Sequence, residues 1–420
     1  MAERKSPTGE SDNPSFDVVV VGAGYVGLAT AVSIAVARPS LRIVIVDAAP
    51  PEVWKNDTRA SAIAAAAGRM LESLDCWEEL APEAQAITDM IVTDSRTADP
   101  VRPVFLTFDG EVEPGQPFAH MVPNRALNGA LRRRAAELGV EILPGLAATG
   151  LDVDPAHALL HLADGRSLEA RLVIACDGVR SRLRDMAGIR TVEWQYSQSG
   201  IVCTIAHERP HNGRAEEHFL PAGPFAILPL TGNRSSIVWT ERTQDAERLV
   251  KEEPLIFEHE LEQRFGLKLG ELRVEGTPRA WPLGLTLARD FVRPRLALAG
   301  DAAHGIHPIA GQGLNLGFKD AAALAEVVVE ADRLGTDFGA LDILQRYESW
   351  RRFDTFQMGV TTDVLNRLFS NDIGPIRAVR DIGLGLVDRM PGLKNFFIRQ
   401  ASGLADMAGP APRLLRGESI

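Results

Sequence analysis

The stretch FDVVVVGAGYVGLATAVSIAVARPS, from Phe16 to Ser40, decides the architecture of this chain. An unbroken apolar run leads into a turn in which Gly22, Gly24 and Gly27 are spaced as G-x-G-x-x-G, and a segment of small and aliphatic residues follows. A second apolar run, LRIVIVD, ends at Asp47. Two wholly apolar strands on either side of a helix predict a β-α-β unit in a parallel sheet that is covered on both faces.

Each residue of this turn has a mechanical role in binding the pyrophosphate of a dinucleotide. Gly22 allows the tight turn, Gly24 lets a phosphate reach the backbone, and Gly27 lets helix and strand pack closely. The first amides of the helix carry partial positive charge, and Asp47 lies where a carboxylate can bind both hydroxyls of a ribose. The sequence therefore predicts a dinucleotide site without saying which dinucleotide it binds.

Composition sets broad limits on function. The 420 residues have a length typical of about two to three domains. The net charge of −11 argues against a nucleic-acid partner. The three cysteines are far apart and form no CxxC, so we expect no metal site and no dithiol centre, and a reducing cytosol fits best. No apolar run is long enough to predict a transmembrane segment.

The character of the chain changes at about residue 190, where short apolar runs separated by turn residues predict an antiparallel sheet. The apolar run RLALA, near residue 296, then returns to the first domain. We expect a disordered tail at 1–15, a first domain formed by 16–100, 120–189 and 290–345, a substrate domain formed by 101–119 and 190–289, and helices at 346–420. Within the first domain, residues 59–74 and 124–138 are each expected to form a helix.

A second glycine-rich segment, GDAAHGIHPIAGQGLNLGFKDA, runs from Gly300 to Ala321 and leads into a helix expected from Leu314 to about Leu334. A first domain that is interrupted by a long antiparallel insert favours FAD over a nicotinamide cofactor. Asp301 can accept a hydrogen bond from a ribityl hydroxyl, and backbone amides at the helix N-terminus can stabilise the charge on a reduced flavin. Those amides belong to Gly311, Gln312, Gly313, Leu314 and Asn315. The fold class is therefore α/β: a Rossmann-like FAD-binding domain, an inserted antiparallel sheet and a helical C-terminus.

Three ordered motifs, DVVVVGAGYVGLA, LADGRSLEARLVIACDGVRSRLR and LALAGDAAHGIHPIAGQGLNLGFKD, together resemble the class A flavoprotein aromatic monooxygenases. The stretch HPIAGQGLNLG resembles in particular the ubiquinone-biosynthesis hydroxylase family. The resemblance covers roughly residues 15–370. Two positions depart from the family pattern: Asp47 stands where Glu is more frequent, and Cys176 stands where Ala is common. Neither change removes a needed group.

The resemblance implies roles for further residues. Asp177 and Gly178 are similar to the second fingerprint of the family, which serves FAD and the passing nicotinamide. Arg59 and Arg125 match arginines on the cofactor side of the cleft. Pro308 matches the proline beside the flavin carbon that takes up dioxygen, so Pro308, Gly311 and Gln312 are the candidate catalytic residues.

The resemblance also implies a reaction. NAD(P)H reduces FAD, dioxygen adds to the reduced flavin, and a C4a-hydroperoxide delivers one oxygen atom to the ring of a polyprenyl phenol in ubiquinone biosynthesis. Because no second G-x-G-x-x-G is present, NAD(P)H binds transiently or a protein donor replaces it. Other ubiquinone-biosynthesis proteins are candidate partners. The expected location is the cytoplasm, with peripheral contact at the inner membrane face as the alternative.

Several alternatives stay open at this point. The chain could be a class A hydroxylase of a small soluble phenol or natural product, or a non-catalytic flavin-holding subunit of a biosynthetic assembly. His304 and His307 either brace the loop or relay protons, and the side to which His218 points is undecided. Residues 360–408 form either a helical lid on the first domain or a surface for lipid or a partner protein.

Overall fold

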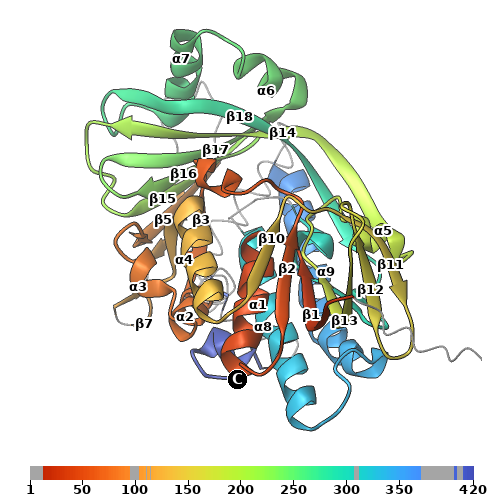
Figure 1. The fold of residues 1–420 in the computed structure, drawn as a ribbon. Coiled ribbons are helices and arrows are strands. Elements are labelled where there is room, and N and C mark those ends of the chain that lie inside the picture. Colours follow the sequence, from red (N-terminus) through yellow and green to blue (C-terminus); the bar gives the residue numbers. More distant parts are fainter. Residues whose placement is uncertain are drawn as a thin grey trace, which may run out of the picture.

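Two eight-stranded sheets organise the chain, and in Figure 1 the second lies above the first. The computed structural model describes residues 13–94, 104–109, 111–113, 115–306, 312–369, 402–403 and 410–420. The α/β class with an antiparallel sheet inserted into an FAD-binding-type domain is confirmed. The region between the two sheets holds the candidate site.

The first sheet contains the predicted β-α-β unit. Its strands follow the order β10 (Glu141–Pro144), β2 (Ile43–Asp47), β1 (Ser15–Val21), β13 (Ser167–Ala175), β12 (Ala158–Leu162) and β11 (Ala148–Val153), and β20 (Leu296–Leu298) and β19 (Val292–Arg293) complete it. Strand β1 pairs in parallel with β2 and with β13, and β20 pairs in parallel with the end of β13. The carboxyl ends of these strands therefore meet at one edge, where ligands bind in such sheets.

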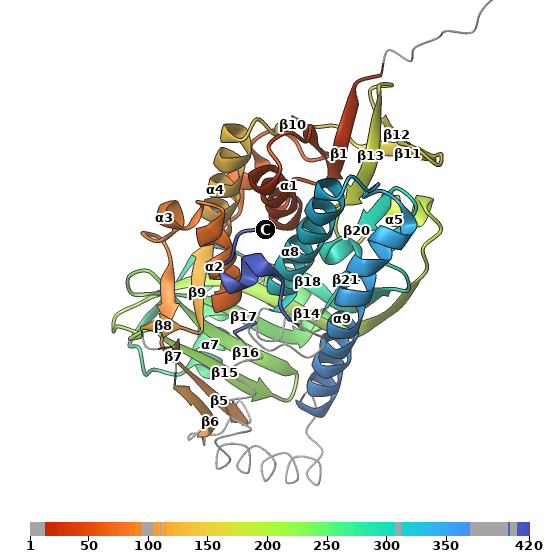
Figure 2. The ribbon, with the colours of Figure 1, turned by 90° about the horizontal axis from the view of Figure 1, so that it is seen from below.

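Helices pack on this sheet, and its central strands are apolar and buried. Helix α1 (Tyr25–Ala37) packs against α8 (Gln312–Arg333) and α4 (Asn124–Glu137), and α9 (Leu341–Phe369) packs against α8 (Figure 2). The side chains of Val18, Val19 and Val20 are fully buried. The helix expected from Leu314 to about Leu334 is confirmed, and Gly335 follows it in the left-handed conformation.

The second sheet is antiparallel except at one pair of strands. Its order is β21 (His304–Gly305), β18 (Leu272–Ala288), β14 (Thr191–His207), β17 (Arg234–Arg242), β16 (Gly223–Leu230), β15 (Arg214–Leu220), β5 (Asp89–Asp94) and β6 (Val104–Asp109). Helices α6 (Thr243–Leu249) and α7 (Pro254–Phe265) lie on its outer side (Figure 1). They cover a separate core that contains Phe225, Ile227 and Trp239. The opposite face of the sheet points toward the first domain.

Residues 59–74 differ from the single helix expected from their sequence. Residues Ala60–Ala64 form strand β3, and only Ala65–Ser73 form a helix, α2. Strand β3 pairs with β9 (Ala119–Pro123), which also pairs with β4 (Gln85–Ile87). Alanine favours a helix locally, but pairing with β9, almost 60 residues further along the chain, satisfies the backbone of β3 as a strand. A two-stranded ribbon, β7 (Glu111–Glu113) with β8 (Gln116–Pro117), lies in the same part of the chain.

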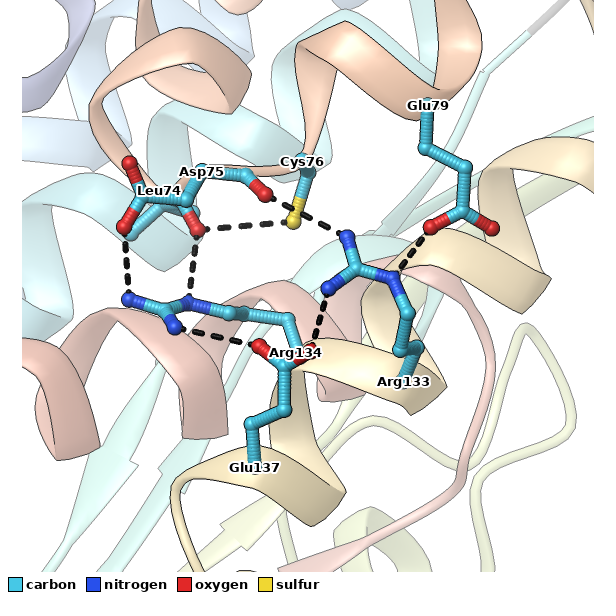
Figure 3. Close-up of polar contacts among 7 residues, drawn as sticks. All are labelled: Leu74, Asp75, Cys76, Glu79, Arg133, Arg134 and Glu137. Carbon is cyan, nitrogen blue, oxygen red and sulfur yellow. Dashed lines mark hydrogen bonds and ion pairs between the residues drawn. The ribbon is translucent and has the colours of Figure 1, made fainter.

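Polar contacts attach α4 to the turn between α2 and α3 (Trp77–Leu80), as Figure 3 shows. The Arg134 guanidinium donates to the Leu74 carbonyl at 3.0 Å and pairs with Asp75 at 2.7 Å. Arg133 contacts Glu79 and also pairs with Glu137 at 2.6 Å. Cys76 is fully buried in this region, and burial raises the pKa of its thiol to about 12, so the thiol packs in the core and is not reactive.

The remaining elements are short. They are α5 (Arg182–Met186) and the 3-10 turns η1 (Val53–Asn56), η2 (Gly300–Ala302) and η4 (Arg413–Arg416). Most of the 360–408 segment, for which a lid or a lipid surface was considered, lies outside the described residues. Among the described helices, none combines the length and the apolar character that crossing a membrane requires.

Candidate active site

The glycine turn after β1 is built as the sequence predicts. Gly22 has a φ of 109°, and a Cβ atom there would lie 2.3 Å from the carbonyl oxygen of Cys176. A Cβ atom on Gly27 would lie 2.0 Å from the Gly22 carbonyl oxygen. At Gly24, in contrast, a Cβ atom would meet nothing within 4 Å, and no side chain caps the first amides of α1. The helix thus begins with free amides beside open space, which suits a pyrophosphate.

Asp47 ends β2 beside this turn. Its carboxylate accepts a hydrogen bond of 3.3 Å from the amide of Ala49 and lies 3.7 Å from the Arg132 guanidinium. Asp47 keeps acceptor capacity on a half-buried carboxylate at the carboxyl end of the parallel strands. That is the position at which a ribose is bound in this kind of fold.

The late loop lies directly against the early one. Gly300 adopts a φ of 61°, and a Cβ atom there would lie 3.1 Å from Val26 of α1. A Cβ atom on Gly317 of α8 would lie 2.4 Å from the same valine side chain. Two segments almost 300 residues apart are thus brought into contact, because glycine at 300 and at 317 leaves room for Val26.

Asp301 follows Gly300 and lines a cavity. Its side chain is accessible from that cavity, but the surrounding protein removes much of its water, and this burial raises the pKa of the carboxyl group. A carboxylate in such a place gains from a hydroxyl donor. The geometry therefore suits the predicted hydrogen bond to a ribityl hydroxyl.

A buried network supports this loop from behind. Asp320 of α8 is fully buried, accepts a 2.9 Å hydrogen bond from the amide of Gly300, contacts Nε2 of His304, and pairs with Arg351 at 2.8 Å. Burial opposes ionisation of Asp320, but His304 and Arg351 outweigh it and lower its pKa. His304 is itself fully buried, which agrees with the loop-bracing alternative.

The start of α8 contributes the next part of the site. Gly313, Leu314 and Asn315 line the cavity. The Asn315 side chain accepts a 2.9 Å hydrogen bond from the amide of Ala64 and donates one of 2.9 Å to the carbonyl of Ala62, so that it fixes the helix start to β3.

Some of the predicted residues around this helix start cannot be placed. His307, Pro308 and Gly311 lie outside the described residues. Gln312 begins α8, but its side chain is not described.

The residues after β13 occupy the same edge of the sheet. Gly178 lines the cavity with a φ of 84°, and Cys176 lines it too. One oxygen of Asp177 accepts hydrogen bonds from the amides of Arg182, at 2.9 Å, and Leu183, at 3.3 Å. Its other oxygen, Oδ1, is buried and has no partner in the described part of the chain. Asp177 thus holds the start of α5 and keeps one acceptor beside the cavity-lining Gly178.

The two predicted arginines lie in different surroundings. Arg59 lines the cavity and pairs with Asp57 at 2.8 Å. Asp57 also accepts a 2.8 Å hydrogen bond from the hydroxyl of Tyr25, another cavity residue. Burial opposes ionisation of Asp57, but the bonds from Arg59 outweigh it and lower its pKa to about 2. Arg125 instead pairs with Glu83 at the surface, at 2.6 Å, and is not among the cavity-lining residues.

These parts enclose a cavity of about 540 Å³ between the glycine loops and the inner face of the second sheet. The sheet side is largely apolar, formed by Met90, Ala215, Pro224, Ala226, Leu228 and Val238, with Thr240 and Glu217 among them. The first-domain side carries the uncapped start of α1, Asp301 and the start of α8. The residues present therefore fit FAD, with an apolar sheet wall facing the cofactor side of the same cavity.

Sequence reasoning missed three residues of this cavity region. Tyr25 and Asp57 follow no recognisable spacing, so no sequence signal marks them. Glu217 could have been found, because two adjacent glutamates in the strand RAEEHFL must point to opposite faces of the sheet. His218, next to it, is not among the cavity-lining residues and lies 2.6 Å from the hydroxyl of Thr93 through Nδ1.

Known proteins resemble this chain over nearly its whole length. Residues 15–352 match the family model described as FAD binding domain. Ubiquinone hydroxylase UbiL of Rhodospirillum rubrum is 44% identical, with 98% of this chain and 94% of that protein covered. The 3-demethoxyubiquinol 3-hydroxylase of Escherichia coli is 32% identical, with 93% and 100% covered. The crystal structure of p-nitrophenol 4-monooxygenase PnpA from Pseudomonas putida, 20% identical, superposes with a TM-score of 0.77, covers 93% of this chain and 98% of that one, and shows the same fold.

The fold and the site thus define a class A flavoprotein monooxygenase, an FAD-dependent aromatic hydroxylase for which NAD(P)H is the typical reductant. The chain belongs to the FAD binding domain family and, within it, to the ubiquinone-biosynthesis hydroxylases. This confirms the resemblance stated from its motifs.

Proposed function

We propose that this protein hydroxylates the aromatic ring of a polyprenyl phenol in ubiquinone biosynthesis. The observation that carries the proposal is the cavity of about 540 Å³ that joins the FAD-binding loops to an apolar sheet wall. Relatives named for ubiquinone hydroxylation, at 44% and 32% identity over almost the entire chain, support the choice of substrate class.

In this proposal the chain's own residues hold FAD at two ends. The amides at the start of α1, beside Gly24, hold the pyrophosphate, and Asp47 holds the adenosine ribose. Asp301 holds the ribityl chain, and the start of α8, at Gly313 and Leu314, holds the ring system. FAD, when bound, supplies hydride uptake from NAD(P)H and the activation of dioxygen.

The second sheet supplies the substrate side. Its apolar side chains, such as Leu228 and Val238, exclude water from the ring to be hydroxylated and orient it toward the cofactor. An apolar wall also suits the prenyl chain, because burying that chain removes hydrocarbon from water. Thr240 and Glu217 are the polar side chains on this wall that can fix the orientation of a phenolic hydroxyl.

The test is turnover by the purified, FAD-loaded protein. We expect dioxygen-dependent NAD(P)H oxidation to rise when a short-chain prenyl phenol is added, and a product that carries one more oxygen atom. NAD(P)H oxidation without that product would overturn the proposal.

A second comparison separates the prenylated substrate from a small soluble phenol. The same ring with and without its prenyl chain is offered to the enzyme. We expect the prenylated phenol to have a kcat/KM at least tenfold higher. Equal or better turnover of the bare phenol would instead support a hydroxylase of small soluble phenols. In cells, deletion of the gene should lead to accumulation of a ubiquinone precursor that lacks one ring hydroxyl.

A further inference from the structure

Glu217 is a carboxyl group in the sheet wall of the cavity. It lies in the middle of β15, is 4% exposed, and lines the cavity together with Ala215, two residues earlier. Because side chains alternate along a strand, Glu216 and His218 point to the other face of the sheet. There Glu216 contacts Lys268 and lies 3.2 Å from His218. Each glutamate of the pair thus faces a different environment.

Among the residues that the structure describes, none gives Glu217 a counter-charge. Its partners on the two adjoining strands are Val92 of β5 and Ala226 of β16. No hydrogen bond or ion pair reaches its carboxyl group from the residues that the structure describes. Burial alone raises the pKa of this group to about 7.

Among the described residues, the other ionisable groups that line the cavity are Tyr25, Arg59, Cys176 and Asp301, all from the first domain. Arg59 and Tyr25 are both bonded to Asp57. Burial raises the pKa of the Cys176 thiol well above its usual range, and burial also raises the pKa of Asp301. Within the described part of the cavity, Glu217 is therefore the acidic group on the substrate side.

A carboxyl group without a hydrogen-bond partner in an apolar wall destabilises a fold, unless a ligand supplies the missing hydrogen bond. An apolar or amide side chain of similar size would be easier to bury. A carboxylate accepts hydrogen bonds, so a ligand that binds it must carry a donor. A phenol carries a hydroxyl donor on an otherwise apolar ring. The cavity thus pairs an apolar surface with one acceptor, as the proposed substrate pairs an apolar ring and tail with one donor.

We propose that Glu217 is the catalytic base of the hydroxylation: its carboxylate accepts the hydrogen bond of the substrate's phenolic hydroxyl and takes that proton as the ring is oxygenated. This inference rests on the proposed function. It assigns to β15 the residue that decides which atom of the ring faces the cofactor.

A ring carbon activated by the hydroxyl donates an electron pair to one oxygen atom derived from dioxygen, and the phenolic O–H bond breaks with its proton passing to Glu217. The resulting dienone loses its ring C–H proton, its carbonyl oxygen takes back the proton held by Glu217, and the ring becomes aromatic again, so that C–H has become C–OH. The second oxygen atom leaves as water, with two electrons supplied by NAD(P)H. Glu217 is then ionised again and can accept the proton of the next substrate.

Binding is the first test, because it does not require turnover. A short-chain prenyl phenol and its methyl ether are titrated into the FAD-loaded protein, as wild type and as Glu217→Gln, between pH 5.5 and pH 8.5. Glutamine keeps the size of the side chain but is a poorer acceptor and no base. We expect wild type to prefer the phenol by at least about tenfold above pH 7, and less below it, because the ionised carboxylate is the stronger acceptor. E217Q should lose most of this preference and its pH dependence.

Turnover is the second test. In E217Q we expect kcat for hydroxylation to fall by about 100-fold, the usual scale for removing a general base. Reduction of FAD by NAD(P)H should change less than threefold. The rise of wild-type kcat through pH 7 should disappear. Glu216→Gln, a matched change on the same strand but the other face, should keep both the phenol preference and the pH profile.

The outcomes separate the two proposals. If wild type hydroxylates the phenol while E217Q keeps its rate, phenol preference and pH profile, the role of Glu217 is wrong and the proposed function stands. Equal effects of E216Q and E217Q would also overturn it, because they would show a structural role. If wild type neither binds nor hydroxylates a prenyl phenol, the proposed function itself fails.

Discussion

The carboxylate of Asp320 accepts a 2.9 Å hydrogen bond from the backbone amide of Gly300, at the start of the loop that carries Asp301. The same carboxylate contacts His304 and, at 2.8 Å, Arg351 of α9. A fully buried anion on α8 therefore fixes the position of the loop that carries Asp301 and, together with Asp354, neutralises a fully buried arginine.

The first prediction concerns this anchor. Asp320→Asn keeps the size of the side chain but removes the buried counter-charge of Arg351, which keeps only its 2.9 Å ion pair with the half-buried Asp354. We expect the free energy of unfolding, from urea titration, to fall by about 3–5 kcal/mol. Asp164→Asn is the control, because it breaks an exposed ion pair with Arg166 and should change stability by less than about 1 kcal/mol. Equal stability of D320N and wild type would show that the charge of Asp320 does not stabilise the fold.

The second prediction concerns the glycine turn. Gly27→Ala places a Cβ atom 2.0 Å from the Gly22 carbonyl oxygen, so helix and strand must separate. We expect weaker FAD binding, and a loss of stability of about 1–3 kcal/mol from overpacking. Gly68→Ala in α2 meets nothing within 4 Å and should be neutral or stabilising by about 0.5–1 kcal/mol. Thermal unfolding and FAD titration compare the two, and a G27A protein that behaves like G68A contradicts the packing argument.

A third prediction tests Asp301 as a cofactor ligand. Asp301→Ala removes one charge-assisted hydrogen bond, which should weaken FAD binding by on the order of 2 kcal/mol, or about 30-fold in Kd. Flavin fluorescence during titration of the apoprotein measures this. Asp290→Asn, which disturbs only an ion pair with Arg293, should leave the Kd unchanged. Full flavin occupancy of D301A at low FAD would argue against the assignment.

The fourth prediction is a pH dependence of stability. The folded protein holds the proton of Glu217 up to about pH 7, whereas the unfolded chain releases it near 4.5. Because the folded-state pKa is raised, the stability that this proton contributes is fully present below pH 4.5 and is lost as pH rises to 7. Relative to E217Q, wild type should lose on the order of 3 kcal/mol across that window. Urea titrations of both proteins at several pH values measure the difference, and parallel curves would mean that the group is not desolvated.

Much of the first domain could be read from the sequence because its signals are local. The run of valines after Asp17, the spacing of Gly22, Gly24 and Gly27, and the ending at Asp47 each follow from strand burial or from close approach of the backbone. The helix that follows Leu314 is also predicted by local sequence signals. The local sequence predicts a helix for the alanine-rich residues 60–64, and this prediction is wrong. These residues pair with β9, which lies almost 60 residues away and is not part of the local sequence.

The sequence predicts candidate residues on the cofactor side of the site but none on the substrate side. Glycines allow a cofactor to reach the backbone, and carboxylates at strand ends can bind its hydroxyls. The spacing of both kinds of residue is visible in the sequence. Glu217 and Asp57 have their roles only because other strands and side chains surround them. Arg125 shows the same limit, since its partner Glu83 lies on a separate segment 42 residues away.

The sequence by itself determined the fold class, the two glycine-rich loops and the family, because each depends on the order and spacing of a few residues whose geometry is fixed by the backbone. Only the tertiary structure decided that Val26 fills the space left by Gly300 and Gly317, that Asp320 lies behind the late loop, and that one of two adjacent glutamates faces the cavity. The burial and the electrostatic environment at these positions depend on residues from distant segments of the chain. Those residues become neighbours only when the chain folds.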